Sequence, residues 1–190
     1  MVIGVAGKYC AGKNSVIFPL ERMGFYHVDV DKLGHAALIN QREKLMETFG
    51  KGIGKEDGTV DRKALGAIVF SDPAARKRLE SIVHPEMIRM TEKIIGEKKN
   101  VIVNAAILFE MKLDRLCDLV FWVDAPWVIR FFRGIKRDNL PGKAVFKRIW
   151  TQRKMNPKNY NSSADIITVR NVGSREKTAE KIEKILKKRM

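Results

Sequence analysis

The architecture expected for this 190-residue chain follows from nine residues near its start, Gly7-Lys8-Tyr9-Cys10-Ala11-Gly12-Lys13-Asn14-Ser15. They read G-x-x-x-x-G-K, the pattern of a phosphate-binding loop, with Asn14 where Ser or Thr is usual. The apolar run VIGVA (2–6) before them predicts a buried strand. A helix is expected after them, from about residue 13 to Met23. A strand, a glycine-containing turn and a helix in this order suit phosphate binding.

The loop pattern has a physical reason for each residue type. Glycines let the main chain curl so that successive N–H groups point at phosphate oxygens, and the start of the helix adds a positive partial charge. Lys13 supplies a full charge near the β- and γ-phosphates. Asn14 offers an amide oxygen in place of the usual hydroxyl ligand of Mg²⁺. We therefore expect the phosphate groups of a nucleotide to be bound by the loop, whose residues are Gly7, Lys8, Tyr9, Cys10, Ala11, Gly12, Lys13, Asn14 and Ser15.

The rest of the chain alternates between predicted strands and helices. Near-continuous apolar runs such as VIVNAAILF (101–109) and CDLVFWVD (117–124) are typical of parallel strands that are covered on both faces. The sequence therefore predicts an α/β fold, a five-stranded parallel sheet with helices on both faces. The further strands are expected at 25–30 and 165–169, and the further helices within 31–98 (with a break at 50–60) and at 126–138, 142–153 and 175–189.

Composition narrows the functional classes. Hydrophobic residues make up 45% and charged residues 31%, a globular balance, and no apolar run approaches the ~20 residues of a membrane span. Two cysteines, Cys10 and Cys117, are too few for a disulfide framework, which makes a reducing cytoplasm the expected location. The net charge of +15 favours anionic partners, either nucleic acid or small phosphorylated molecules.

A pair of carboxylates follows the second predicted strand, in Val28-Asp29-Val30-Asp31. Strand alternation would place both aspartates on one side of the chain, at the edge of the sheet where ligands bind. A carboxylate there can accept a proton from a hydroxyl group or help to hold Mg²⁺. The alternative is that one of them only caps the helix expected from Lys32.

Several motifs in this order resemble the dephospho-coenzyme A kinase family. They are the loop GKYCAGKNS, VDVDKLGH (28–35), DGTVDRKAL (57–65), the SDP…HP segment (71–85), ILFE (107–110), VDAP (123–126) and RFFRGIKRD (130–138). The resemblance implies a P-loop kinase fold with a helical acceptor-binding region and a lid. It also implies transfer of the γ-phosphoryl group of ATP to the ribose 3′-hydroxyl of dephospho-CoA, with Mg²⁺ as the metal.

The resemblance also implies roles for single residues. Asp31 matches the family's proposed catalytic base, and Lys13 the lysine that carries the ATP phosphates. Arg133 and Arg137 match lid residues that face the transferred phosphoryl group. The implied acceptor contacts are Asp31, His35, Arg62 and His84, and the implied metal ligands are Asn14 and Asp31. The implied single domain (1–190) has a core of 1–30, 99–128 and 164–190, an acceptor-binding region of 31–98 and a lid of 129–163.

Some positions depart from the family pattern or have a second interpretation. Asn104-Ala105-Ala106 replaces a Val-Pro pair, and the segment 153–163 lacks the family's Arg-Glu-x-Arg-Leu pattern. Pro85 is expected to steer His84 away from a helical backbone. A structural role is the alternative for His35 and for His84. Trp122, Trp127 and Trp150 are expected to pack against other side chains, with stacking on a base as the alternative.

Two other functions stay open from sequence: a kinase for another hydroxyl acceptor, and a nucleotide- or nucleic-acid-binding protein without turnover. Against nucleic acid, the sequence has no helix-turn-helix, zinc-finger or RNA-reading aromatic signature. We therefore expect ATP and dephospho-CoA as partners, no nucleic acid, no membrane, and a monomer or weak homo-oligomer.

Overall fold

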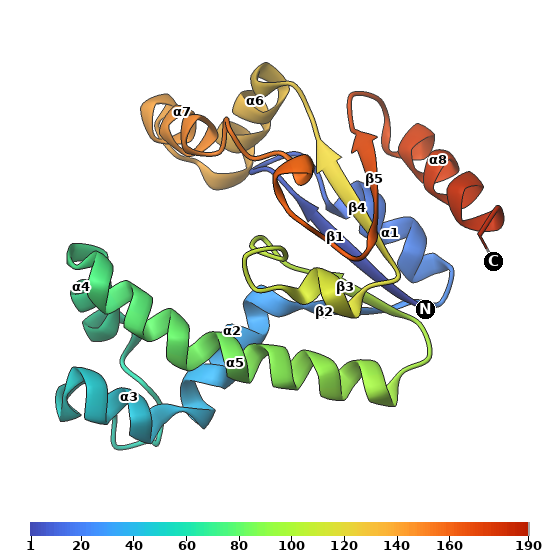
Figure 1. Cartoon of the computed structure of the whole chain (residues 1–190). Helices are drawn as coiled ribbons and strands as arrows, with labels where there is room; N and C mark the ends of the chain where they lie inside the picture. Colours follow the sequence, from blue (N-terminus) through green and yellow to red (C-terminus); the bar gives the residue numbers. More distant parts are fainter. Residues whose placement is uncertain (190) are drawn as a thin grey trace. The chain divides into compact units, whose positions relative to one another are not determined.

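One parallel sheet organises the computed structural model, which describes residues 1–189 (Figure 1). The strand order is β2-β3-β1-β4-β5, and the registers of β1 with β3 and β4, and of β4 with β5, are parallel. The predicted five-stranded parallel sheet is therefore confirmed. The strands are β1 (Val2–Gly7), β2 (Tyr26–Asp29), β3 (Val101–Asn104), β4 (Leu119–Asp124) and β5 (Asp165–Arg170).

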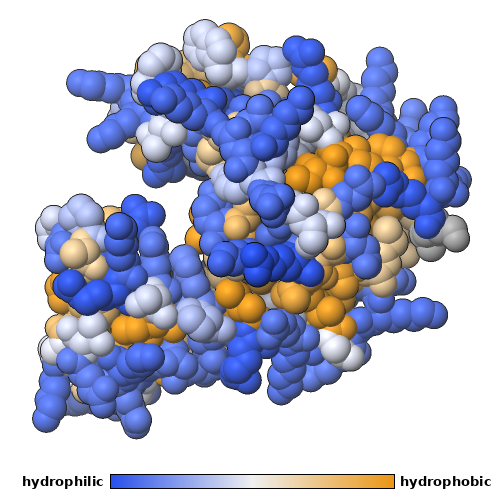
Figure 2. All heavy atoms as spheres, viewed as in Figure 1, coloured by the Kyte–Doolittle hydropathy of each residue, from blue (hydrophilic) through white to orange (hydrophobic). Residues whose placement is uncertain are grey.

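Two helices cover one face of this sheet. They are α1 (Asn14–Arg22) and α8 (Arg175–Lys187), which pack against each other and against the strands. Leu20 of α1 and Leu186 of α8 are fully buried with Ile3 and Phe121 in one hydrophobic cluster. Figure 2 shows that the exterior is mostly hydrophilic, while apolar residues gather beside β5 and α8. The buried stripe of each helix is thus what attaches it to the sheet.

The segment 105–117 packs on the opposite face of the sheet. A Cβ atom on Gly4 of β1 would lie 3.0 Å from Cys117 Sγ and 3.3 Å from Leu108 Cδ1. Leu108 and Leu113 are fully buried, and Leu113 begins the short 3₁₀ helix η2 (Leu113–Leu116). The central strands are therefore enclosed on both faces, which explains why their sequences are almost continuously apolar.

A helical hairpin follows β4. Its helices are α6 (Trp127–Asp138) and α7 (Gly142–Thr151), which contact each other. Asn139 ends α6 in the left-handed conformation at φ +50°, a role that asparagine tolerates. A 3₁₀ turn, η3 (Pro157–Asn159), then leads to β5. The hairpin lies within the predicted lid region, and its helices match the predicted ones at 126–138 and 142–153.

The chain forms two compact units. The first joins Met1–Val28 to the chain from Lys98 onward, and the second is Asp29–Glu97, nearly the predicted acceptor-binding region. The second unit is helical, with the predicted break near residues 50–60. Its helices are α2 (Val30–Asn40), α3 (Arg42–Phe49), η1 (Lys51–Ile53), α4 (Arg62–Ser71) and α5 (Pro73–Glu97).

Two local expectations are wrong. Strand β2 ends at Asp29, so Asp31 lies in the first turn of α2 and strand alternation does not relate the two aspartates. His84 and Pro85 lie inside α5, where buried Val83 and Met87 hold the helix against its neighbours despite the missing N–H of proline. Of the three tryptophans, Trp122 is 2% exposed, whereas Trp127 and Trp150 are each 55% exposed.

No helix within residues 1–189 combines the length and the apolar character that a membrane crossing requires.

Candidate active site

The phosphate-binding loop is curled by its close approach to β4 and by two residues with positive φ. A Cβ atom on Gly7 would lie 2.2 Å from the carbonyl oxygen of Val123, so only glycine fits there. Gly12 has φ +91° and Cys10 has φ +56°. The amide of Ala11 donates to the carbonyl of Lys8 over 3.0 Å, which closes the curl. The loop therefore has the conformation that its glycines predict.

A cavity of about 530 Å³ opens beside this loop, and we call it the phosphate cavity. Helix α1 begins at Asn14 on its rim, so the positive end of the helix dipole lies at the cavity. Half of the other lining residues are basic. The cavity brings together seven residues that the sequence assigns to the site, namely Cys10, Gly12, Lys13, Asn14, Ser15, Arg133 and Arg137, and adds Lys136, Asn171, Gly173 and Arg175.

Asn171 is a residue of this site that sequence analysis missed. It is 2% exposed, and its Nδ2 donates to the carbonyl of Ala11 over 2.9 Å and to that of Gly12 over 3.3 Å. Its Oδ1 accepts from the hydroxyl of Thr178 in α8. Asn171 therefore fixes the loop from the end of β5. The available signal was its position after a parallel strand, at the edge of the sheet where ligands bind.

Arg133 of α6 ties the hairpin to the loop. Its two terminal nitrogens donate to the carbonyls of Ala11, over 3.1 Å, and of Asn171, over 3.3 Å. A guanidinium at this point is anchored by two carbonyls while it lines the phosphate cavity. This geometry gives the predicted lid arginine a defined place in the site.

Arg137, the second predicted lid arginine, forms a two-pronged ion pair with Asp138. Arg137 Nε lies 2.6 Å from one carboxylate oxygen of Asp138, and Nη2 lies 3.1 Å from the other. The guanidinium, joined by a hydrogen bond from Tyr9, lowers the pKa of Asp138 to about 2. The same ion pair raises the pKa of Arg137. Asp138 thus keeps Arg137 charged and oriented beside the cavity.

Tyr9 is the point at which the loop and the hairpin meet. Its hydroxyl donates to Asp138, and its ring lies beneath the guanidinium of Arg137, 5.0 Å from ring centroid to Cζ. Its backbone amide donates to Gln152 Oε1 over 2.5 Å. Burial of the hydroxyl and its bond to Asp138 raise the pKa of Tyr9. One loop residue is therefore held by α6 and by the residue that follows α7.

Known proteins match this chain along nearly its whole length. The family model for dephospho-CoA kinase (CoaE) matches residues 1–176. The chain belongs to the dephospho-CoA kinase family. A dephospho-CoA kinase of Geobacter sulfurreducens is 33% identical, covering 99% of this chain and 98% of the relative.

Solved structures agree with this family membership. The crystal structure of TT1252 from Thermus thermophilus has a TM-score of 0.79 at 28% identity, covering 99% of this chain and 97% of the other. Dephospho-CoA kinase from Campylobacter jejuni has a TM-score of 0.67 at 25% identity, covering 98% and 95%. The predicted P-loop kinase fold is confirmed.

The predicted acceptor residues of this dephospho-CoA kinase family member lie on the helices of the second unit. Asp31 and His35 are exposed on α2, and Arg62 is exposed at the first position of α4. His84 is partly buried within α5, and this burial lowers its pKa. Their roles stay predictions, because they rest on the family motif.

A buried carboxylate joins two helices of the second unit. Glu86 of α5 is 7% exposed; it accepts from Asn40 Nδ2 of α2 over 2.7 Å and from Arg89 over 2.7 and 2.8 Å. These bonds, led by that from Arg89, lower the pKa of Glu86 to about 2. Glu86 therefore joins α2, which carries Asp31, to α5.

Proposed function

We propose that this chain transfers the γ-phosphoryl group of ATP to the ribose 3′-hydroxyl of dephospho-CoA. Membership of the dephospho-CoA kinase family is the observation that carries this proposal. The phosphate cavity supports it, because a curled loop, a helix start and several cations line one cavity.

The loop and Lys13 bind the triphosphate. Successive loop N–H groups and the start of α1 hold phosphate oxygens, and the ammonium group of Lys13 neutralises their charge. Asn171 keeps the loop in this conformation through its two carbonyl contacts. Because the loop is already curled, little of the binding free energy is lost in ordering it.

Arg133 and Arg137 stabilise the charge on the transferred phosphoryl group. A guanidinium stays protonated and can present two donors to phosphate oxygens. Arg133 is positioned by the carbonyls of Ala11 and Asn171, and Arg137 by Asp138. These anchors fix the donors before ATP arrives, which is what charge stabilisation in a transition state requires.

Asp31 accepts the proton of the 3′-hydroxyl group. It lies in the first turn of α2, where the positive end of the helix dipole favours the ionised carboxylate. An ionised carboxylate can orient the acceptor hydroxyl and take its proton as the new P–O bond forms.

Mg²⁺ would be held mainly by the triphosphate itself. Residues 1–189 contain no cluster of three or more His, Cys, Asp or Glu side chains that could hold a metal ion. Asn14 lines the phosphate cavity, and its amide oxygen is a chemically suitable single ligand. The carboxylate of Asp31 is the second candidate ligand. A bound Mg²⁺ would neutralise phosphate charge.

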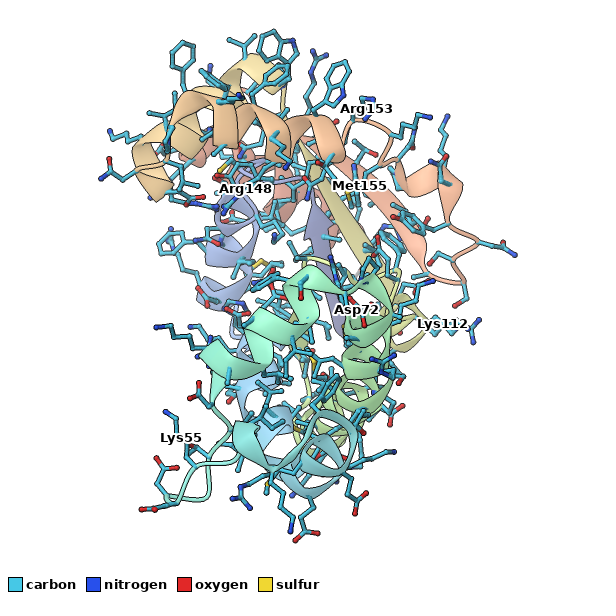
Figure 3. All side chains as sticks on the ribbon, turned by 90° about the vertical axis from the view of Figure 1, so that its left-hand side faces the viewer. Lys55, Asp72, Lys112, Arg148, Arg153 and Met155 are labelled. Atoms are coloured by element: carbon cyan, nitrogen blue, oxygen red, sulfur yellow. The ribbon has the colours of Figure 1, made fainter. Side chains whose placement is uncertain are left out.

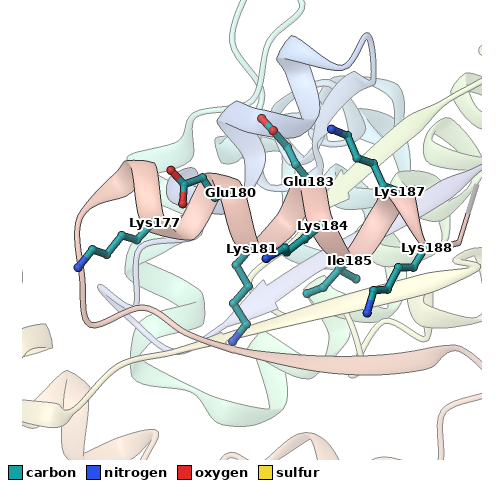
Figure 4. A pocket seen from close by; sticks show the side chains of 8 residues that line it. All are labelled: Lys177, Glu180, Lys181, Glu183, Lys184, Ile185, Lys187 and Lys188. Atoms are coloured by element: carbon teal, nitrogen blue, oxygen red, sulfur yellow. The ribbon is translucent and has the colours of Figure 1, made fainter.

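The basic surface does not by itself require a nucleic-acid partner. Helix α8 carries the acidic side chains Glu180 and Glu183 on one side and the basic side chains Lys177, Lys181 and Lys188 on the other (Figure 4). The two carboxylates offset part of the positive charge of this helix. A cytoplasmic location and a monomeric or weakly oligomeric state remain predictions.

A coupled ADP-release assay tests the proposal. Purified protein is given ATP and, separately, dephospho-CoA, AMP or shikimate. We expect turnover with dephospho-CoA to exceed that with the other acceptors. Asp31→Asn should lower kcat by at least about 100-fold, the usual scale of general-base catalysis, while ATP still binds. Asp29→Asn is the control carboxylate. No turnover of dephospho-CoA would overturn the function, and an active Asp31→Asn would remove Asp31 as the base.

A further inference from the structure

A second cavity, of about 900 Å³, lies between the hairpin and the carboxyl ends of β4 and β5. We call it the aromatic cavity, and all of its lining belongs to the first unit. Trp127 of α6 and Phe146 and Trp150 of α7 form its apolar wall. Lys8, on the phosphate-binding loop, also lines it, so the cavity adjoins the loop that binds ATP.

One lining residue of this cavity is a buried arginine with an unpaired donor nitrogen. Arg130 is 4% exposed, its Nε has no hydrogen-bond partner within residues 1–189, and its Nη1 makes only a long 3.5 Å contact with the carbonyl of Tyr9. Leaving a buried donor unpaired is costly, so this guanidinium is suited to an anionic ligand. Lys8, Arg153 and Arg170 also line the cavity, against a single carboxylate from Asp124.

The aromatic side chains of this cavity favour a flexible chain over a planar nucleobase as the ligand. Phe146 and Trp150 already stack on each other, with centroids 5.9 Å apart and an interplanar angle of 21°. The guanidinium of Arg153 lies over the ring of Trp150, 4.7 Å from its centroid. Trp127 meets Phe146 edge to face. These contacts occupy ring faces that a nucleobase would need for stacking, while the remaining ring edges suit an alkyl and amide chain.

We infer that the aromatic cavity binds the non-reacting arm of dephospho-CoA, with its diphosphate on Arg130 and neighbouring cations and its pantetheine chain along Trp127, Phe146 and Trp150. This inference rests on the proposed function for its choice of ligand. The arm is an anion joined to an amphipathic chain, which is the combination that the lining offers. Contacts of this kind, remote from the reacting hydroxyl, determine which acceptor is bound.

Exposed side chains allow a test without disturbing the core. Trp150 is 55% exposed and Arg153 is exposed after α7, where Figure 3 shows it projecting from the ribbon. We compare Trp150→Ala and Arg153→Gln with Phe132→Ala, which removes a 66% exposed aromatic ring of α6 that does not line the cavity. The first readout is calorimetric binding of 4′-phosphopantetheine, which contains the pantetheine chain and one of the two phosphate groups, without adenosine. The second is the KM for dephospho-CoA.

We expect both cavity variants to weaken 4′-phosphopantetheine binding and to raise the KM for dephospho-CoA by about 10-fold, on the scale of losing one aromatic or arginine contact. The kcat and the KM for ATP should change less than about twofold, and Phe132→Ala should match the wild type. An unchanged KM in the cavity variants would overturn the inference, as would displacement of 4′-phosphopantetheine by AMP. If 4′-phosphopantetheine binds as expected but dephospho-CoA is not phosphorylated, the arm site stands and the proposed function fails.

Discussion

Replacing Gly12 by alanine tests how the phosphate-binding loop is held. Gly12 has φ +91°, and an added Cβ atom would lie 2.2 Å from Nδ2 of Asn171. The side chain of Asn171 must then move away from the carbonyls of Ala11 and Gly12, to which it donates. Gly12→Ala therefore combines backbone strain with the loss of the contacts that fix the loop.

The structure supplies a control that separates these two effects. Gly24 has nearly the same φ, +88°, but an added Cβ atom would meet nothing within 4 Å. Both alanine variants carry a backbone penalty of ~1–2 kcal/mol. Only Gly12→Ala also leaves buried polar groups unpaired, which costs ~1–3 kcal/mol more. For a protein of this size that difference lowers Tm by about 2–12 °C relative to Gly24→Ala.

Thermal unfolding by circular dichroism, with and without ATP, measures both consequences. We expect Gly24→Ala to keep the increase in Tm that ATP produces and Gly12→Ala to lose most of it, because ligand binding stabilises only a loop that can bind. In the double variant Gly12→Ala with Asn171→Gly, the added Cβ atom no longer overlaps with the side chain of Asn171. The loss of stability in the double variant should therefore be smaller than the sum of the losses in the two single variants. Equal Tm values for Gly12→Ala and Gly24→Ala, with the ATP effect intact in both, would refute the reasoning.

Three further predictions concern hydrogen bonds and burial. Tyr9→Phe removes the hydrogen bond from the Tyr9 hydroxyl to Asp138. Because such a bond contributes ~1 kcal/mol, its loss should raise the KM for ATP about fivefold. An unchanged KM would contradict the role of Tyr9. Because the folded-state pKa of Glu86 is about 2, below its unfolded value of ~4.3, its stabilising effect is present above pH ~4.3 and disappears as the pH falls towards 2. When urea unfolding is measured at several pH values in this range, the free energy of unfolding of Glu86→Gln should fall less steeply with decreasing pH than that of the wild type. An equal pH dependence in the two proteins would argue against this role of Glu86. Burial raises the pKa of the Cys117 thiol to about 12, so this thiol should resist alkylation by iodoacetamide at pH 8 in the native protein. Mass spectrometry measures the labelling. Rapid labelling of the native protein would show that the site opens.

Local pattern was sufficient to predict the sheet, the loop and the family. The apolar runs at β1, β3 and β4 and the glycines at 7 and 12 reflect constraints that act within a few residues along the chain. Burial on both faces of a parallel strand and the curl of the loop are such constraints, so residue type and spacing express them directly. The order of motifs from GKYCAGKNS to RFFRGIKRD then indicated the kinase family that the comparisons show.

Contacts between distant parts of the chain decided the rest. The bond from Asn171 to Ala11 spans 160 residues, and that from Tyr9 to Asp138 spans 129, so no local spacing could indicate them. Trp127 and Trp150 look like interior residues by type, yet the packing of α6 on α7 leaves them exposed along one cavity. The sequence alone therefore predicted the curled loop and the helix that follows it, whereas folding of the hairpin onto the loop determined what holds the loop in place. That arrangement depends on long-range packing and not on local conformational preference.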